Sequence, residues 1–282
     1  MSAVKARLGN VRLVRLSASR PELVPSGVHH RSMANGRVRC LFCYEDSGDN
    51  LVASSEHLLS RPVAAAFGID RRSSVARVDG DVEEIRWMQL NGIKRRCVCT
   101  RCNNGWMNRL EHSMAGIATW ISGPIGEPIG AARALDLRNW ALKTHMLLCF
   151  IEGNAGRFGE DTFTGEYVVP PVTPAKALYK GDHNALAHCV VGVTRSTSRT
   201  DFAWSFGTPS VTAPGGVKGH PRFAPVSIVT VGSLQLWVVV PLLPARVTMP
   251  AGVQVCRAGL RPDELARTGH PMNLGLVRVD FE

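Results

Sequence analysis

Four cysteines in this chain stand in two Cys-x-x-Cys pairs, a spacing typical of metal sites. Cys40 pairs with Cys43, and Cys99 pairs with Cys102. A tight turn inside each pair lets both sulfurs reach one ion, and two pairs complete a closed tetrahedral site for a structural zinc. The interval between the pairs is longer than in an ordinary zinc ribbon, so we expect the metal to clamp the ends of an inserted element. Cys97 is an alternative to Cys99.

Groups suited to hydrolysing a phosphodiester bond lie between these pairs and just after them. Glu56 directly precedes His57. An imidazole suits the role of general base because its pKa lies near neutral pH. Carboxylate and side-chain amide oxygens, which Glu56 and the asparagines after Cys102 would supply, are ligands that Mg²⁺ accepts. Neighbouring residues of a strand point to opposite faces, so Glu56 and His57 need a bend or a strand end to share one site.

The pattern around these groups predicts the elements that position them. Residues 85–90 and 93–98 are expected to be strands, joined by Asn91-Gly92, a strong signal for a two-residue hairpin. The stretch 71–84 before them is polar. After the second cysteine pair the spacing turns helical, with apolar residues on one face. These are Trp106, Leu110, Met114 and Ile117.

Beyond a loop rich in glycine and proline, the sequence predicts one more helix and then strands. Asp136 is expected to cap a helix that runs to about Ile151. Strands are expected at 189–194, 202–206, 226–231 and 234–240. The last two flank Gly232-Ser233, a type II′ hairpin signature.

These elements predict an α+β protein with two units. Residues 40–112 form a small zinc-stabilised domain. Residues 113–282 form a helix followed by a mainly antiparallel β domain whose role the sequence does not reveal.

Positive charge is concentrated at the start of the chain. The 282 residues carry a net charge of +10, and 45% of them are hydrophobic. Residues 1–39 hold eight Lys and Arg side chains against one Glu, so we expect a basic, disordered tail. The alternative is that Met33 is the true start. No secretory signal is recognisable and no apolar stretch approaches the ~20 residues of a membrane span, so we expect a cytoplasmic protein without a membrane partner.

The cysteine frame, the Glu56-His57 dipeptide and the segment after Cys102 together resemble the zinc-knuckle branch of the HNH endonucleases. That segment reads Asn-Asn-Gly-Trp-Met and is soon followed by Leu-Glu. The resemblance covers about residues 38–112, a quarter of the chain. It implies that residues 40–112 adopt the ββα-metal fold of that family.

The resemblance also implies a role for individual residues. His57 would be the general base, and Asn91 would orient it. Glu56, where the family usually has Asp, and Asn103, at the last motif position, would bind Mg²⁺ or another divalent cation. Three further residues are alternatives for that last position, or simply form one polar helix face. They are Asn104, Asn108 and His112.

Double-stranded DNA is the partner that this resemblance and the positive charge indicate. Five basic residues near the second cysteine pair are expected to contact phosphates, a solvated charged surface being the alternative. They are Lys94, Arg95, Arg96, Arg101 and Arg109. A homodimer is also possible.

The leading hypothesis is therefore a Mg²⁺-dependent DNA endonuclease with a structural zinc. The alternative is a non-catalytic, zinc-stabilised nucleic-acid-binding protein. A third interpretation makes residues 40–112 a scaffold and gives the function to the C-terminal β region.

Overall fold

The computed structural model describes most of the chain from Cys40 to Phe281. The described residues are 40–43, 53–69, 72–79, 82–89, 94–123, 127–154, 172–197, 201–207, 210–212, 225–241, 245–268 and 276–281. The expected basic tail, residues 1–39, and the expected turn at Asn91-Gly92 lie outside them.

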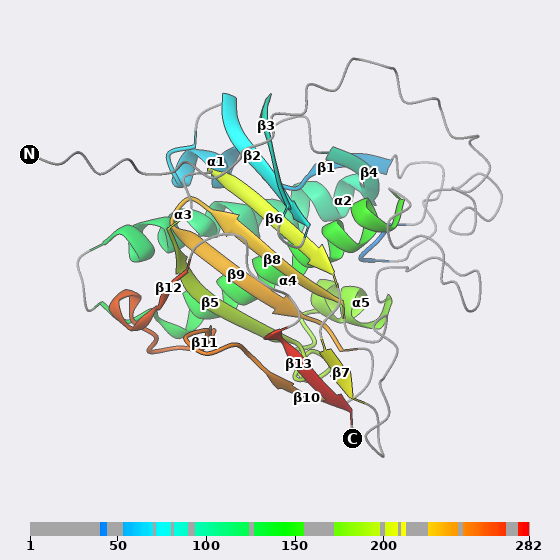
Figure 1. Cartoon of the computed structure of the whole chain (residues 1–282). Helices are drawn as coiled ribbons and strands as arrows, with labels where there is room; N and C mark the ends of the chain where they lie inside the picture. Colours follow the sequence, from blue (N-terminus) through cyan, green and yellow to red (C-terminus); the bar gives the residue numbers. More distant parts are fainter. Residues whose placement is uncertain are drawn as a thin grey trace, which may run out of the picture.

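The first half of the chain alternates short strands with helices (Figure 1). Its elements are β1 (Ala53–His57), α1 (Arg61–Ala66), β2 (Arg72–Asp79), β3 (Val82–Gln89), β4 (Lys94–Cys99), α2 (Thr100–Cys102), η3 (Asn103–Met107), α3 (Asn108–Ser122) and α4 (Ala131–Asn154). β1 pairs with β4 in antiparallel fashion, and the chain then passes through the kinked segment η3 into α3. A strand pair followed by a helix thus contains the second cysteine pair.

Strands β3 and β4 do not pair, so the hairpin expected across Asn91-Gly92 is wrong. β3 pairs along its length with β2, from Arg72 opposite Gln89 to Asp79 opposite Val82. β4 pairs with β1 and belongs to a different sheet. A turn signal is local, whereas the partner of a strand is selected by packing over its whole length. The polar stretch before β3 supplies that partner.

The second half of the chain is mainly β, as expected. Its elements are α5 (Val172–Lys180), β5 (Val190–Ser196), β6 (Phe202–Gly207), β7 (Ser210–Thr212), β8 (Val226–Val231), β9 (Leu234–Val239), β10 (Ala245–Thr248), β11 (Gln254–Val255), η6 (Pro262–Glu264), β12 (Arg267–Thr268) and β13 (Arg278–Phe281). The β8–β9 hairpin is confirmed, and Gly232 has the positive φ of 54° that a tight two-residue turn needs. The helix expected to begin at Asp136 begins earlier, at Ala131, directly after the loop residue Gly130.

One large sheet organises the molecule (Figure 1). Its order is β11-β5-β9-β8-β6-β2-β3, with β12 also paired to β5, and β10, β13 and β7 form a smaller sheet. Helix α4 packs against β5, β6, β8 and β9 on one face. On the other face, Trp237 and Val239 of β9 pack with Val279 of β13 and with Val277, which directly precedes β13. Both faces of the central strands are therefore covered, which explains why every residue of β8 and β9 is buried, including the polar Ser227, Thr230 and Gln235.

The expected boundary between residues 112 and 113 falls inside α3. β2 and β3 join the large sheet beside β6, and one continuous set of buried side chains reaches from Cys40 to Leu265. The α+β class is confirmed, but the two expected units share one sheet and one core.

Helix α4 is the central support of this core. Its residues Ala141 to Cys149 are all buried, yet the stretch includes Lys143 and His145, which are fully buried too. Within the described residues, no helix combines the length and the apolar character that crossing a membrane requires.

His145 joins α4 to the large sheet. Its Nδ1 lies 2.8 Å from Ser227 Oγ on β8, and its Nε2 lies 3.4 Å from Cys149 Sγ. Burial lowers the pKa of His145 to about 3. The imidazole is therefore neutral at ordinary pH and serves as a polar bridge inside the core.

The buried imidazole predicts a loss of stability in mild acid. Between pH 6 and pH 4 an unfolded histidine takes up a proton that the folded His145 does not, so the free energy of unfolding should fall by up to about 1.4 kcal/mol per pH unit from this group. Urea unfolding at pH 6, 5 and 4 should show a steeper decline for wild type than for His145→Asn. Exposed His183→Asn is the control and should follow wild type; equal slopes for wild type and His145→Asn would contradict the assignment.

Candidate functional site

The two cysteine pairs meet in one buried cluster. The sulfurs of Cys40, Cys43, Cys99 and Cys102 all lie within 4.8 Å of one another. Cys43 Sγ and Cys99 Sγ are 3.8 Å apart, far beyond a disulfide bond of about 2.05 Å. A tetrahedron with zinc–sulfur bonds of about 2.3 Å has edges of about 3.8 Å. The cluster can therefore hold a metal such as zinc.

Backbone contacts bring the pairs together. Leu41 N donates to Cys97 O across 2.8 Å, which attaches the first pair to β4. At the start of α2, Cys102 N lies 3.4 Å from Cys99 Sγ and donates to it. Cys97 thus contributes its carbonyl and stays outside the cluster, so the alternative to Cys99 is not realised.

The pKa values of the Cys40 and Cys102 thiols shift in opposite directions. The pKa of Cys40 is lowered to about 5, first because the Cys102 side chain hydrogen-bonds to its sulfur. The same contact, together with burial, raises the pKa of Cys102. A thiolate beside a thiol is a favourable starting state for a divalent cation, which replaces the remaining protons.

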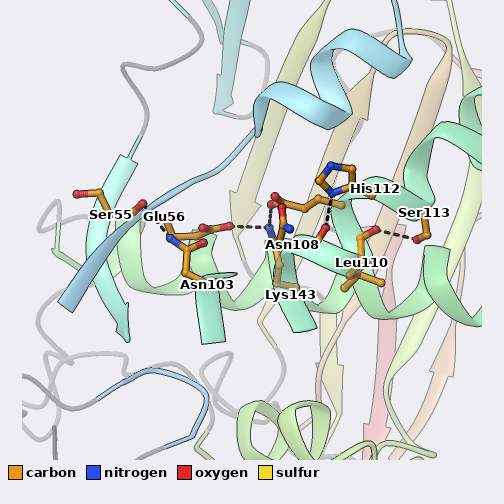
Figure 2. A network of polar contacts seen from close by, with 9 residues as sticks. Ser55, Glu56, Asn103, Asn108, Leu110, His112, Ser113 and Lys143 are labelled. Carbon is orange, nitrogen blue, oxygen red and sulfur yellow. Dashed lines mark hydrogen bonds and ion pairs between the residues drawn. The ribbon is translucent and has the colours of Figure 1, made fainter. Parts of the chain in front are cut away.

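Glu56 does not face an open site. Its Oε1 accepts a hydrogen bond from Lys143 Nζ at 2.8 Å (Figure 2), and the same ammonium donates to Glu111 Oε1 at 2.6 Å. Lys143 is fully buried, and Glu56 is 4% exposed. A strand, α3 and α4 each contribute one member of this buried triad.

The triad is held by its charges. Burial alone would lower the pKa of Lys143, but the carboxylates of Glu56 and Glu111 outweigh burial and raise it, so the ammonium stays charged. The pKa of Glu56 is raised, because burial together with the neighbouring Glu111 carboxylate outweighs the lowering effect of Lys143. A lysine ammonium thus occupies the place beside Glu56 in which the sequence-based hypothesis put a divalent metal.

His57 ends β1 and is only half-buried, one residue after the buried Glu56. Asn103, in the kinked segment, reaches the same strand. Its Nδ2 donates to Ser54 Oγ at 2.7 Å and to Ser55 O at 3.4 Å (Figure 2). The segment after the second cysteine pair is therefore fastened to the strand that carries His57. With Nδ2 used as donor, Oδ1 is the Asn103 atom that a cation would take.

The alternatives for the last motif position lie on the surface. Asn104, Asn108 and His112 are exposed, and His112 Nδ1 contacts the backbone oxygen of Asn108 in its own helix at 2.7 Å. Their arrangement fits the polar helix face. Asn91, expected to orient the base, lies outside the described residues.

The basic residues expected to contact phosphates divide into two groups. Arg96, Arg95 and Lys94 lie on β4 opposite Ser55, Glu56 and His57 in register. Arg101 and Arg109 are exposed on α2 and α3.

Sequence reasoning missed Lys143 and Glu111 as partners of Glu56. A signal was present, since Lys143 is a charge inside an otherwise apolar helix and such residues are rarely buried without a partner. Which partner it has depends on how α4 crosses β1 and α3. Burial also raises the pKa of three thiols outside the cluster, those of Cys149, Cys189 and Cys256.

Comparison with family models, with curated proteins and with solved structures gives no significant match.

The triad predicts a large stability difference between two lysine substitutions. Lys143→Met should lower the free energy of unfolding by about 3–5 kcal/mol, because it leaves two buried carboxylates without their cation. Lys180→Met, at an exposed position, is the matched control and should change it little. Adding Glu56→Gln and Glu111→Gln to Lys143→Met should recover part of the loss in urea unfolding. Equal stability of Lys143→Met and Lys180→Met would refute this role.

The cluster predicts a bound metal that depends on its four cysteines and not on the nearby Cys97. Metal analysis of purified protein should find about one zinc per chain. Cys102→Ser should lose the metal, whereas Cys97→Ser, a buried cysteine on the same side of the fold but outside the cluster, should retain it. Loss of zinc from both variants alike would argue against this ligand set.

Proposed function

We propose that this protein is a metal-dependent endonuclease that hydrolyses phosphodiester bonds in DNA, with His57 as its general base. The resemblance to the zinc-knuckle HNH endonucleases supplies the reaction class. A ββα-metal element would be formed by β1, β4 and the helix that follows Cys102.

The observation that carries this proposal is the attachment of Asn103 to β1. Through Ser54 and Ser55 it holds the segment after the second cysteine pair against the strand that ends at His57. This supports a site in which one imidazole and one amide oxygen approach the same phosphate. His57 is half-buried, so a substrate can reach it while the strand restricts its motion.

In this proposal His57 takes a proton from the water that attacks the phosphorus. A zinc held by Cys40, Cys43, Cys99 and Cys102 would act only on structure, and the four cysteines would fix the start of α2 against the first cysteine pair. Asn103 would help to hold a divalent cation, which would supply stabilisation of negative charge on the scissile phosphate.

Glu56 fits the role of metal ligand less well than the other residues. Its carboxylate is buried and bonded to Lys143, so binding a cation would require that contact to break. In the proposal Glu56 therefore anchors the end of β1 and positions His57, the residue that follows it.

The contact between Glu56 and Lys143 favours a second candidate function, that of a zinc-stabilised nucleic-acid-binding protein without catalysis. One ammonium already pairs with both Glu56 and Glu111, so Glu56 is engaged without a divalent metal. This candidate binds DNA but does not cleave it.

A cleavage assay separates the two candidates. Zinc-loaded protein should nick supercoiled plasmid when Mg²⁺ or Mn²⁺ is added, and His57→Ala should reduce the rate about 10²–10⁴-fold without loss of zinc. His112→Ala is the matched control, since this imidazole is exposed on α3, and should cleave like wild type. No cleavage by wild type that nevertheless binds DNA would favour the non-catalytic candidate, and equal cleavage by His57→Ala would remove His57 from the mechanism.

A further inference from the structure

Helix α5 presents two lysines on one exposed face. Its buried side consists of small and apolar residues, which are Pro174, Ala175, Ala177 and Leu178. Lys176 and Lys180 are exposed and are spaced four residues apart, so they lie above each other on the helix surface. Neither forms an ion pair with another described residue. The helix is thus fixed by packing, while its two charges remain directed to solvent.

The fold brings α5 next to the second cysteine pair, although 78 positions separate the two contacting residues. Arg101 Nη2 on α2 donates to the hydroxyl of Tyr179 on α5 across 3.1 Å. Arg101 directly precedes Cys102 and Asn103, the latter fastened to the strand of His57. Figure 1 shows α5 and α2 on the same side of the molecule, away from η6 and β12.

We infer that Arg101, Lys176 and Lys180 form one surface that binds the phosphate backbone of DNA, and that α5 extends the contact beyond residues 40–112. The inference rests on the proposed function for the identity of the polyanion. It gives the C-terminal part of the chain a role in holding the substrate.

Charge and position together select a phosphate backbone as the occupant. Three exposed cations, two on α5 and one joined to α5 through Tyr179, offer a phosphate backbone several charged donors close to the candidate site. The nearest acidic residue in sequence, Asp182, has its Oδ1 engaged by Ala185 N at 3.1 Å, so it caps its own turn. Contacts between these three cations and phosphates neutralise charge without reading bases, so the binding is independent of the DNA sequence.

The test compares two pairs of neutralised residues in a DNA-binding titration. The probe is a short fluorescein-labelled duplex, followed by anisotropy at several salt concentrations without Mg²⁺. Lys176→Gln/Lys180→Gln should weaken binding about tenfold and lower the slope of log K against log salt by about 1.8. Arg257→Gln/Arg261→Gln removes the same charge from an exposed region on the other side of the molecule, and should leave both quantities near those of wild type.

The outcomes separate this inference from the proposed function. Equal weakening by both double variants would mean that only net charge matters and would overturn the surface. Unchanged binding by Lys176→Gln/Lys180→Gln would overturn it as well, even if the wild type cleaves DNA. Selective weakening supports the surface, and it does so even if the wild type fails to cleave. A wild type that binds an acidic protein but no duplex would also reject it.

Discussion

A single buried ammonium connects the parts of this structure on which the candidate site depends. Lys143 of α4 donates to Glu56 of β1 and to Glu111 of α3. A charge at full burial is tolerated only with partners in good geometry, so this contact restricts how the three elements can approach one another. Because His57 follows Glu56, the position of the candidate base is set by a lysine more than eighty residues away.

Helix α4 also links these elements to the large sheet. Two residues after Lys143, His145 turns to the large sheet and contacts Ser227 on β8. The same helix therefore fixes the strand pair on one side and the sheet on the other. This shared support accounts for the common core of residues 40–112 and the β-rich part of the chain, with β2 and β3 paired into the large sheet.

The structure also separates two roles that the sequence places close together. The cysteine cluster is buried, and its four sulfurs could hold a metal such as zinc. His57 and Asn103 lie at the edge of the same strand pair, within reach of solvent. The chemistry proposed for them depends on the cluster for its frame, while Glu56, which sequence spacing groups with them, belongs to the interior.

The sequence by itself determined what local chemistry can determine. The Cys-x-x-Cys spacing indicated the cluster, helical periodicity placed Leu110, Met114 and Ile117 on a buried face, and alternation with turn residues located β5, β6, β8 and β9. Only the tertiary structure decided which strand pairs with β3, which cation faces Glu56, and that α5 lies beside Arg101. These are contacts between residues distant in sequence, and they follow from the packing of whole elements, which no local pattern encodes.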